Sequence, residues 1–536
     1  MTIRHRSHRL LTGAYVLVAT LVPHFIHAQK EITKGPNSAF DSSAYLHYLL
    51  ALRFATDGIP HSALHEAAAS LRIQAKDNPA ATLAFQLITE QRQNVHIRLC
   101  CFNAKVLSAR YSPDGTRVMT VLDDRTLRIW DAETGRQMFA AMQHDGDILA
   151  AEWSADGKRI VSSSRDAKLH LWDTATGKPV RQPFILEKPL THIALSPDGD
   201  TVLGSYKGAV YLFHVLSGET ISTKPAYHDD VNVVTFSNDG KYALIATNDD
   251  VADIVDATTA KRLHRLPLGN AAFSAVFSND SRYAMTASED HTAHIWDVNT
   301  GMAQGKGFVQ SGAISDAVFS QDGVMVLTTS YDHTARVWSA RTGEAKTPLL
   351  QHSASVVNGG FSADGTLVFT RARDLTVRVW NVATGEEAMG PVRDIGDYND
   401  VMFSPRDPKL LLAIGNTVEI MDVAPGEAPP QWLADLADFE ASRSRFDQTV
   451  TTDSRTSIET LRQSLLSSKS TNRWSQFGKW YFATPGDRTV SPWSHISLQE
   501  YFQNILGLNS PESLAYAKQI GAGHPAWLLQ IKEREQ

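Results

Sequence analysis

Short runs of alternating apolar and polar residues, broken by turn residues, dominate the middle of the chain. In DAVFSQDGVMVLTTSYDHTARVWSARTGEAKTPL (316–349), such runs are separated by turn signals roughly every ten residues. Within TARVW (334–338), Ala335 and Val337 fall on one face of an extended strand and Trp338 falls on the other. This pattern predicts small antiparallel β-sheets rather than helices.

The same pattern returns with a period of 41 or 42 residues. One recurring apolar position is occupied by Trp130, Trp172, Phe213, Val255, Trp296, Trp338, Trp380 and Met421. A second position, which precedes a turn such as SPDG or SQDG, is occupied by Tyr111, Trp153, Leu195, Phe236, Phe277, Phe319, Phe361 and Phe403. Self-similarity at this period is typical of repeat architectures built from four strands per unit.

A sheet of this size cannot bury both of its faces alone, so the units are expected to stack around an axis as an all-β propeller. A strand within NVHIRLC (94–100) is expected to complete the last sheet, because APGEAPP (424–430) is poor strand material. The span 94–430 divides into eight units of the observed period, which predicts eight blades. Seven blades with a separate hairpin are the alternative.

Helical periodicity appears on both sides of the repeats. Before them, residues 61–93 predict two helices separated by the Asn78-Pro79 start signal, and residues 42–55 predict a further helix. After them, helices are predicted in the segments 430–444, 458–468, 497–508 and 510–521. The predicted organisation is a leader over 1–28, a helical segment over 29–93, a propeller over 94–430 and a helical segment over 431–536.

The first 28 residues have the composition of a secretory signal peptide. Arginines at positions 4, 6 and 9 precede the apolar stretch Leu10 to Val22, and small residues follow, ending at Ala28. Thirteen apolar-biased residues are too few to span a bilayer comfortably, so cleavage is favoured over an uncleaved anchor. We therefore expect an exported protein, periplasmic or secreted, with no stable membrane span after cleavage.

Composition and charge exclude some classes of function. The chain has 536 residues with a net charge of -7, and no basic run follows the extreme N-terminus, which argues against nucleic-acid binding. The two cysteines, Cys100 and Cys101, are adjacent, so free thiols on a strand are expected rather than a disulfide framework.

The repeats resemble the WD-repeat family over roughly residues 94 to 430. That family carries a buried chain of Trp, Ser or Thr, His and Asp, whose polar groups satisfy one another. The matching residues are Trp130, Trp172, Trp296, Trp338 and Trp380; Asp124, Asp166, Asp249, Asp290, Asp332 and Asp374; Ser164, Thr247, Ser288 and Ser330, two residues before the Asp; and His144, His228 and His352. The resemblance predicts one complete tetrad, in the second unit, consisting of His144, Ser164, Asp166 and Trp172.

In the WD-repeat family, the residue just before the turn Asp points outward and contacts partners. The corresponding residues here are Asp123, Arg165, Asn248, Glu289, Tyr331 and Arg373. The set mixes both charges, so it indicates neither an acidic nor a basic partner. Tyr331 and Arg373 are of the types enriched in interface hot spots.

No residue pattern supports a catalytic, metal or cofactor site. His291 and His333 each follow a turn Asp, which makes a structural turn position the favoured interpretation. Acidic pairs such as Asp249-Asp250 lack the spaced oxygen donors of a calcium loop. Nucleophile-elbow and kinase motifs are absent from the sequence.

Segments of the C-terminal part complete the resemblance. Trp432-Leu433, Trp474, Trp480, Ser491-Pro492 and Glu500-Tyr501 resemble a bacterial type of WD-repeat protein with tetratricopeptide-like flanks, sometimes fused to protein kinases. This resemblance implies a non-enzymatic scaffold that binds a protein partner, identity unknown, on the propeller face. The alternatives are an enzyme with a site in the central channel of the propeller, or helical flanks that carry the binding site.

Overall fold

The computed structural model describes residues 60–74, 80–91, 97–99 and 104–535, together with scattered positions between 44 and 55. Within 104–535 the exceptions are 218, 225–226, 394–397, 424–429, 444–451, 484–487, 509–510 and 522–524. The predicted leader (1–28) and both cysteines lie outside the described residues. No helix in the described ranges has the length and apolarity needed to cross a bilayer.

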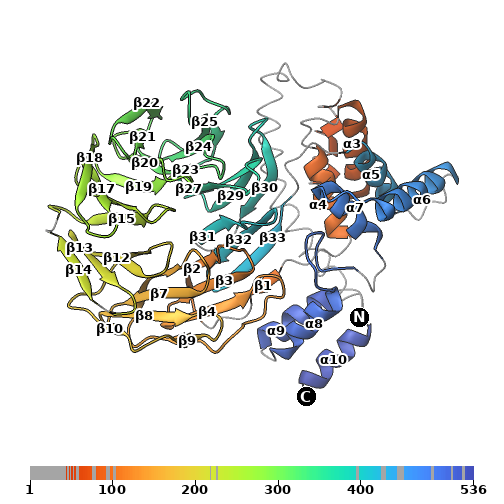
Figure 1. The fold of residues 1–536 in the computed structure, drawn as a ribbon. Helices are drawn as coiled ribbons and strands as arrows, with labels where there is room; N and C mark the ends of the chain where they lie inside the picture. The colour runs from red at the N-terminus through yellow and green to blue at the C-terminus, as the bar shows by residue number, and fades with distance from the viewer. Residues whose placement is uncertain are drawn as a thin grey trace, which may run out of the picture.

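Eight antiparallel sheets are arranged around a central axis (Figure 1). Blade 1 contains β2 (Val106–Tyr111), β3 (Arg117–Leu122), β4 (Thr126–Asp131) and β5 (Met142–Gln143). Blade 2 contains β6 (Ile148–Trp153), β7 (Arg159–Ser164), β8 (Lys168–Asp173), β9 (Lys178–Pro179) and β10 (Phe184–Ile185). Blade 3 contains β11 (His192–Leu195), β12 (Thr201–Tyr206), β13 (Ala209–His214) and β14 (Thr220–Lys224). Blade 4 contains β15 (Val231–Phe236), β16 (Tyr242–Thr247), β17 (Val251–Asp256) and β18 (Arg262–Pro267).

The remaining four blades follow the same plan. Blade 5 contains β19 (Ala272–Phe277), β20 (Tyr283–Ser288), β21 (Thr292–Asp297) and β22 (Ala303–Val309). Blade 6 contains β23 (Ile314–Phe319), β24 (Met325–Ser330), β25 (Thr334–Ser339) and β26 (Leu350–Gln351). Blade 7 contains β27 (Val356–Phe361), β28 (Leu367–Ala372), β29 (Thr376–Asn381) and β30 (Glu387–Arg393). Blade 8 contains β31 (Tyr398–Phe403), β32 (Lys409–Ile414) and β33 (Thr417–Asp422).

Blade 8 is closed by the strand that precedes blade 1. Strand β1 (Ile97–Leu99) pairs antiparallel with β33, with Ile97 opposite Ile420 and Leu99 opposite Val418. The prediction of eight blades is confirmed, and the seven-bladed alternative is wrong.

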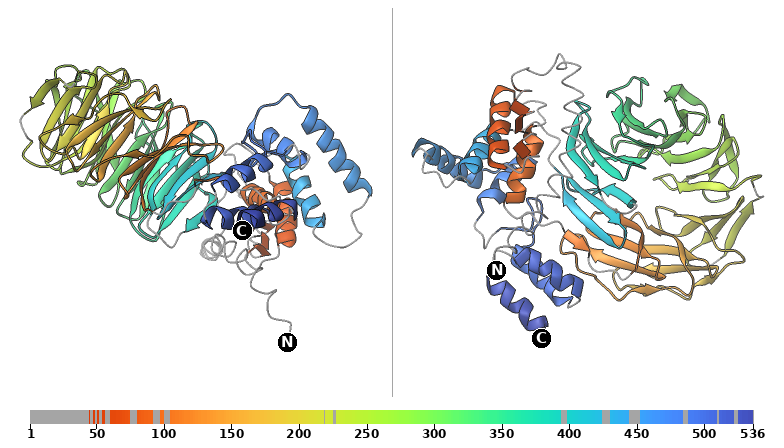
Figure 2. Two further views of the ribbon diagram at one scale, coloured as in Figure 1. Left: turned by 90° about the horizontal axis from the view of Figure 1, so that it is seen from below. Right: turned by 180° about the vertical axis from the view of Figure 1, so that it is seen from behind.

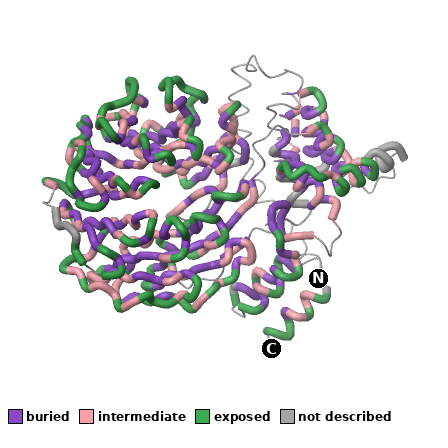
Figure 3. The backbone as a smooth tube through the Cα atoms, viewed as in Figure 1, coloured by how far each residue is buried: buried purple, intermediate pink, exposed green. Residues whose placement is uncertain are grey.

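Apolar residues of neighbouring blades form the cores between sheets. Ile295 and Phe308 of blade 5 pack in one cluster with Val326 and Trp338 of blade 6. The second strand of blade 6, β24, is buried on both faces over five consecutive residues because it lies between two neighbouring sheets, while exposed residues gather in the turns (Figure 3).

The helices from both ends of the chain lie together beside blades 7, 8 and 1 (Figures 1 and 2). They are α3 (Pro60–Ile73), α4 (Ala80–Gln91), α5 (Trp432–Arg443), α6 (Thr452–Ser467), α7 (Arg473–Phe482), α8 (Leu498–Gly507), α9 (Pro511–Ile520) and α10 (Pro525–Glu535). Phe85 of α4 packs in one hydrophobic cluster with Leu433 of α5 and Phe477 of α7. The segments before and after the propeller thus share one core. We call helices α3 to α7 the helical unit.

A second group of helices covers the sheet that closes the ring. Tyr501 and Phe502 of α8 are fully buried in a cluster with Ile97 of β1 and Ile420 of β33. The Tyr501 hydroxyl accepts a hydrogen bond of 2.8 Å from the backbone N–H of Arg98. Helices α8 to α10 therefore brace the contact between the first and last strands.

Candidate interaction face of the propeller

One face of the propeller is built from the turns that join the second and third strands of each blade. In blades 5 and 6 the turn carboxylate accepts a hydrogen bond from the backbone N–H two residues later. Thr292 donates to Asp290 at 2.8 Å, and Thr334 donates to Asp332 at 2.9 Å. The residue between the two has a positive φ, 72° at His291 and 73° at His333. Both histidines are exposed turn residues, in agreement with the structural interpretation of the Asp-His pairs.

All six residues predicted to point outward from this face are exposed. They are Asp123, Arg165, Asn248, Glu289, Tyr331 and Arg373. Each immediately precedes the turn carboxylate of its blade. They do not form one continuous cluster, because several engage different neighbours.

Tyr331 and Arg373 lie together on blades 6 and 7. The guanidinium carbon of Arg373 is 5.3 Å from the centroid of the Tyr331 ring, a cation–π geometry. The centroid of the Tyr331 ring also lies 5.8 Å from that of Phe273 in blade 5. We call Phe273, Tyr331 and Arg373 the aromatic cluster. The sequence analysis did not include Phe273, which belongs to an inner strand rather than a turn.

The other predicted face residues make separate contacts. Asp123 accepts a hydrogen bond of 2.8 Å from the backbone N–H of Lys105. Arg165 lies 3.5 Å from Asp147 in an exposed ion pair. The amide group of Asn232 donates to Asn248 at 2.6 Å. For the side chain of Glu289, the described residues provide no hydrogen-bond or ion-pair partner.

The predicted tetrad in blade 2 needs a correction at Ser164. The indole N–H of Trp172 donates to Ser162 Oγ at 2.8 Å, and His144 Nε2 lies 3.0 Å from the same oxygen. Ser164 instead donates to Asp166. Ser164 stands two residues further along the strand, about 6–7 Å farther from the Trp172 ring, so its hydroxyl cannot reach the indole.

The same hydroxyl position recurs in four other blades, always ten residues before the Trp. The indole N–H groups of Trp130, Trp296, Trp338 and Trp380 donate to Thr120, Thr286, Thr328 and Thr370 at 2.7 to 3.0 Å. The spacing of hydroxyl and Trp in the repeat, rather than the distance to the Asp, is the signal that would have identified it.

A continuous chain of hydrogen bonds is present in blade 7, not in blade 2. His352 Nε2 lies 2.7 Å from Thr370 Oγ1, and His352 Nδ1 lies 3.4 Å from Asp374. In blade 2, His144 Nδ1 and Asp166 Oδ2 have no hydrogen-bond partner among the described residues. The expectation that only the second unit completes the tetrad is therefore wrong.

The central channel is lined by the first strand of each blade, since these inner strands contact one another around the ring. Arg110 of β2 forms an ion pair of 2.6 Å with Glu152 of β6 and lies 3.9 Å from Asp400 of β31. Burial raises the pKa of Glu152, and the Arg110 charge opposes this increase. Asp316 of β23, whose pKa burial also raises, accepts a hydrogen bond of 2.9 Å from Asn358.

Arg110 thus lies near carboxylates of both neighbouring blades, and Asp316 is held by an amide of the next blade. In the described ranges, no three His, Cys, Asp or Glu side chains are close enough together to hold a metal ion.

The buried histidines of blade 2 predict a pH-dependent stability. Burial and the neighbouring His170 ring, 4.2 Å away between centroids, lower the pKa of His144 to about 4. The unfolded chain binds that proton near pH 6.5. Protonation therefore favours the unfolded state, and the free energy of unfolding is expected to fall by up to about 3 kcal/mol between pH 6.5 and 4. In the His144→Gln protein, the free energy of unfolding measured by urea denaturation should change less with pH over this range. The same pH dependence in the variant and the wild type would show that His144 is not the titrating group.

The fold and the repeat geometry define an eight-bladed β-propeller. Four segments match the family model described as WD domain, G-beta repeat, at residues 95–131, 137–173, 263–297 and 305–339. The propeller therefore carries WD40 repeats, and each matched segment contains a Trp together with its hydroxyl partner. Phe213, Val255 and Met421, which stand in place of the Trp, lie outside the matched segments.

Among solved structures, the crystal structure of the computationally designed Ika8 protein is similar to this chain. The similarity has a TM-score of 0.51 at 19% identity and covers 60% of this chain and 96% of Ika8. At this identity it shows the fold alone. No curated protein matches the sequence.

Proposed function

We propose that this protein is an exported, non-enzymatic scaffold that binds a protein partner through the aromatic cluster on blades 5 to 7. Propellers with WD40 repeats are typical protein-interaction scaffolds, which supports the general class. The proposal of export rests on the composition of residues 1–28. The same proposal includes a tetratricopeptide-like character of the helical unit.

The observation that carries the proposal is the exposed Tyr331 ring, which contacts both Phe273 and Arg373. Tyr331 is 38% exposed although it is a large aromatic side chain. These two contacts restrict the ring before a partner binds, which lowers the side-chain entropy cost of binding. Tyrosine and arginine on a rigid platform form the kind of anchor that dominates protein interfaces.

The double substitution Tyr331→Ala with Arg373→Glu is expected to weaken partner binding by about thirtyfold or more. The substitutions remove the ring and reverse the charge above it, while both positions are exposed. Partner capture by the exported protein, followed by affinity measurement with the purified partner, gives the result. The melting temperature should remain close to that of the wild type.

A photo-crosslinking residue gives a control that does not depend on affinity. Leu375 is 39% exposed and lies in the face turn beside Arg373, whereas Val324 is 57% exposed at the opposite end of strand β24. Crosslinks to the partner are expected from position 375 and not from position 324. Crosslinks from 324 alone, or full affinity in the double variant, would place the binding site elsewhere, with the helical unit as the next candidate.

A further inference from the structure

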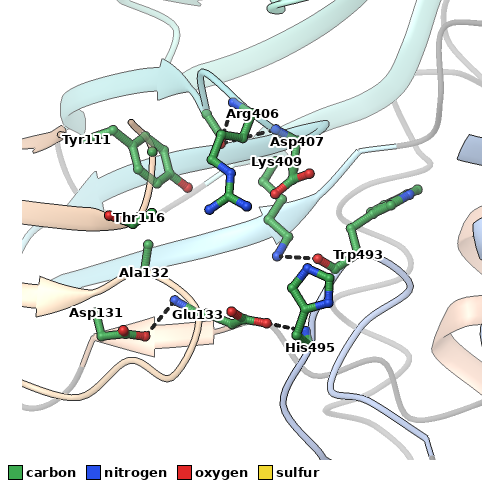
Figure 4. A pocket seen from close by; sticks show the side chains of 12 residues that line it. Tyr111, Thr116, Asp131, Ala132, Glu133, Arg406, Asp407, Lys409, Trp493 and His495 are labelled. Carbon is green, nitrogen blue, oxygen red and sulfur yellow. Dashed lines mark hydrogen bonds between the residues drawn. The ribbon is translucent and has the colours of Figure 1, made fainter. Parts of the chain in front are cut away.

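A pocket of about 170 Å³ lies on the opposite face, where blade 8 meets blade 1 (Figure 4). The turn after β2, the residues after β4 and the turn before β32 form its walls, and Trp493 and His495 of the C-terminal segment close one side. The volume is comparable to the roughly 150 Å³ cavity that holds a benzene molecule in another protein. A molecule of about six heavy atoms therefore fits.

The repeat itself shows that this junction is built differently from its counterparts. In blades 1 and 2, the first residue of the second strand is an arginine that reaches the next blade. Arg117 donates to the carbonyls of Gly157 and Thr174 at 2.8 and 3.2 Å, and Arg159 donates to Gly199 at 3.2 Å. These guanidinium groups bridge their junctions.

The equivalent residue of blade 8 is Lys409, and it makes no such bridge. Lys409 is only 6% exposed, yet within the described residues its ammonium group has a single acceptor, the Trp493 carbonyl, at 3.5 Å. No carboxylate in the described part of the chain lies within ion-pair distance of it. A buried ammonium group with one long contact is costly to leave unpaired.

A second repeat position changes charge at the same junction. In the other seven blades the turn between the first two strands carries an Asp that accepts a hydrogen bond from the preceding Ser, at 2.5 to 2.7 Å. In blade 8 this position is Arg406. Among the described residues, the Arg406 guanidinium has no hydrogen-bond or ion-pair partner, and its side chain lies against Gly115 of blade 1.

A third donor is the hydroxyl of Tyr111. The residue is 5% exposed, and its oxygen has no hydrogen-bond partner among the described residues. Figure 4 shows Tyr111, Arg406 and Lys409 lining the same space.

The acidic residues of the pocket already have donors. Asp407 pairs with Arg473 at 2.9 Å. Asp131 accepts the backbone N–H groups of Glu133 and Thr134 at 3.1 and 2.7 Å. Glu133 accepts from Ser494 Oγ at 3.3 Å and from the backbone N–H of His495. The donors that remain available are the buried Tyr111 hydroxyl, which has no partner within the described residues, the Lys409 ammonium group with its one long contact, and the exposed guanidinium group of Arg406.

We propose that this pocket binds a small oxyanion-bearing ligand, whose carboxylate or phosphate group is held by Lys409, Arg406 and the hydroxyl of Tyr111. Charge-assisted hydrogen bonds from a guanidinium and an ammonium group are the usual means of holding such anions. Because the site lies on the face opposite the aromatic cluster, it is independent of the proposed partner surface.

Isothermal titration calorimetry of the full chain with succinate and with inorganic phosphate tests the proposal. Saturable binding of at least one probe is expected, and the stronger probe identifies which group the site prefers. Tyr111→Phe, which removes only the hydroxyl, and Lys409→Met, which removes only the charge, should each weaken binding about tenfold or more. Arg406→Asp, which restores the residue found in the other blades, should abolish it.

Arg159→Met is the matched control, because it removes the equivalent cation from a junction that is already bridged. It should leave the affinity for either probe unchanged. Failure of both probes to bind, or binding that persists unchanged in Arg406→Asp and Lys409→Met proteins with wild-type melting curves, would overturn the proposal. If these variants fail to fold, Tyr111→Phe alone decides, since the hydroxyl it removes has no partner within the described residues.

Discussion

Trp172→Ala is expected to lower the free energy of unfolding by about 3–5 kcal/mol. The side chain is 5% exposed, and its ring stacks on His170 with centroids 5.2 Å apart. Truncation opens a cavity between blades 1 and 2, and it also leaves the Ser162 hydroxyl without the indole donor. The loss of packing and the loss of a buried hydrogen bond act in the same direction.

Urea denaturation measures this loss, with Trp172→Phe as the matched variant. Phenylalanine occupies the equivalent position of blade 3 at Phe213, so this variant keeps an aromatic ring and loses the N–H donor and the five-membered ring of the indole. We expect Trp172→Phe to cost less than half as much as Trp172→Ala. An unfolding curve that Trp172→Ala leaves unchanged would contradict the placement of this residue between blades.

Phe477→Ala is expected to destabilise the helical unit by a similar amount, about 3–5 kcal/mol. Phe477 is fully buried, and its ring lies 5.1 Å from Phe85, 6.1 Å from Trp474 and 6.2 Å from Trp480. Phe85 comes from the segment before the propeller and Phe477 from the segment after it. One truncation therefore loosens the contact between both ends of the chain.

Limited proteolysis and thermal denaturation separate this effect from a loss of the propeller. Cleavage within both helical segments should increase, while the blades remain resistant. Leu466→Ala on α6 is the control, because that side chain is 47% exposed and its removal should change little. Equal protease resistance of Phe477→Ala and wild-type protein would mean that the two segments do not depend on each other.

The repeat made most of the propeller predictable. The two recurring positions, one mostly Trp and one mostly aromatic before a turn, predict the number of blades because each unit repeats the same local hydrogen bonds and the same packing. The tetrad hydroxyl was assigned wrongly at Ser164 because its position was counted from the turn Asp and not from the Trp. Ser162 and Ser164 share one face of the strand, and the strand register, with Ile160 opposite Trp172, places Ser162 beside the indole.

Features that join distant parts of the chain could not be predicted from the local pattern. Phe273 and Tyr331 meet across two blades, and Phe85 meets Phe477 although almost 400 residues separate them. Aligning the repeats shows that Lys409 and Arg406 differ from the residues at the same positions of the other blades. The pocket they line could not be predicted from the repeats, because Trp493 and His495, which line one side of it, come from the C-terminal segment.

The pairing of β1 with β33 also sets an order of events during synthesis. Blades 1 to 7 are each made from consecutive strands, so each can form once its own segment has emerged from the ribosome. Strand β1 is made before all of them but finds its partner only after residue 422 has been added. Until then, strand β1 has no partner, and the unpaired backbone groups of such a strand promote aggregation. A chain that stops anywhere before Asp422 is thus expected to be recognised by chaperones or proteases rather than to persist as a seven-bladed ring.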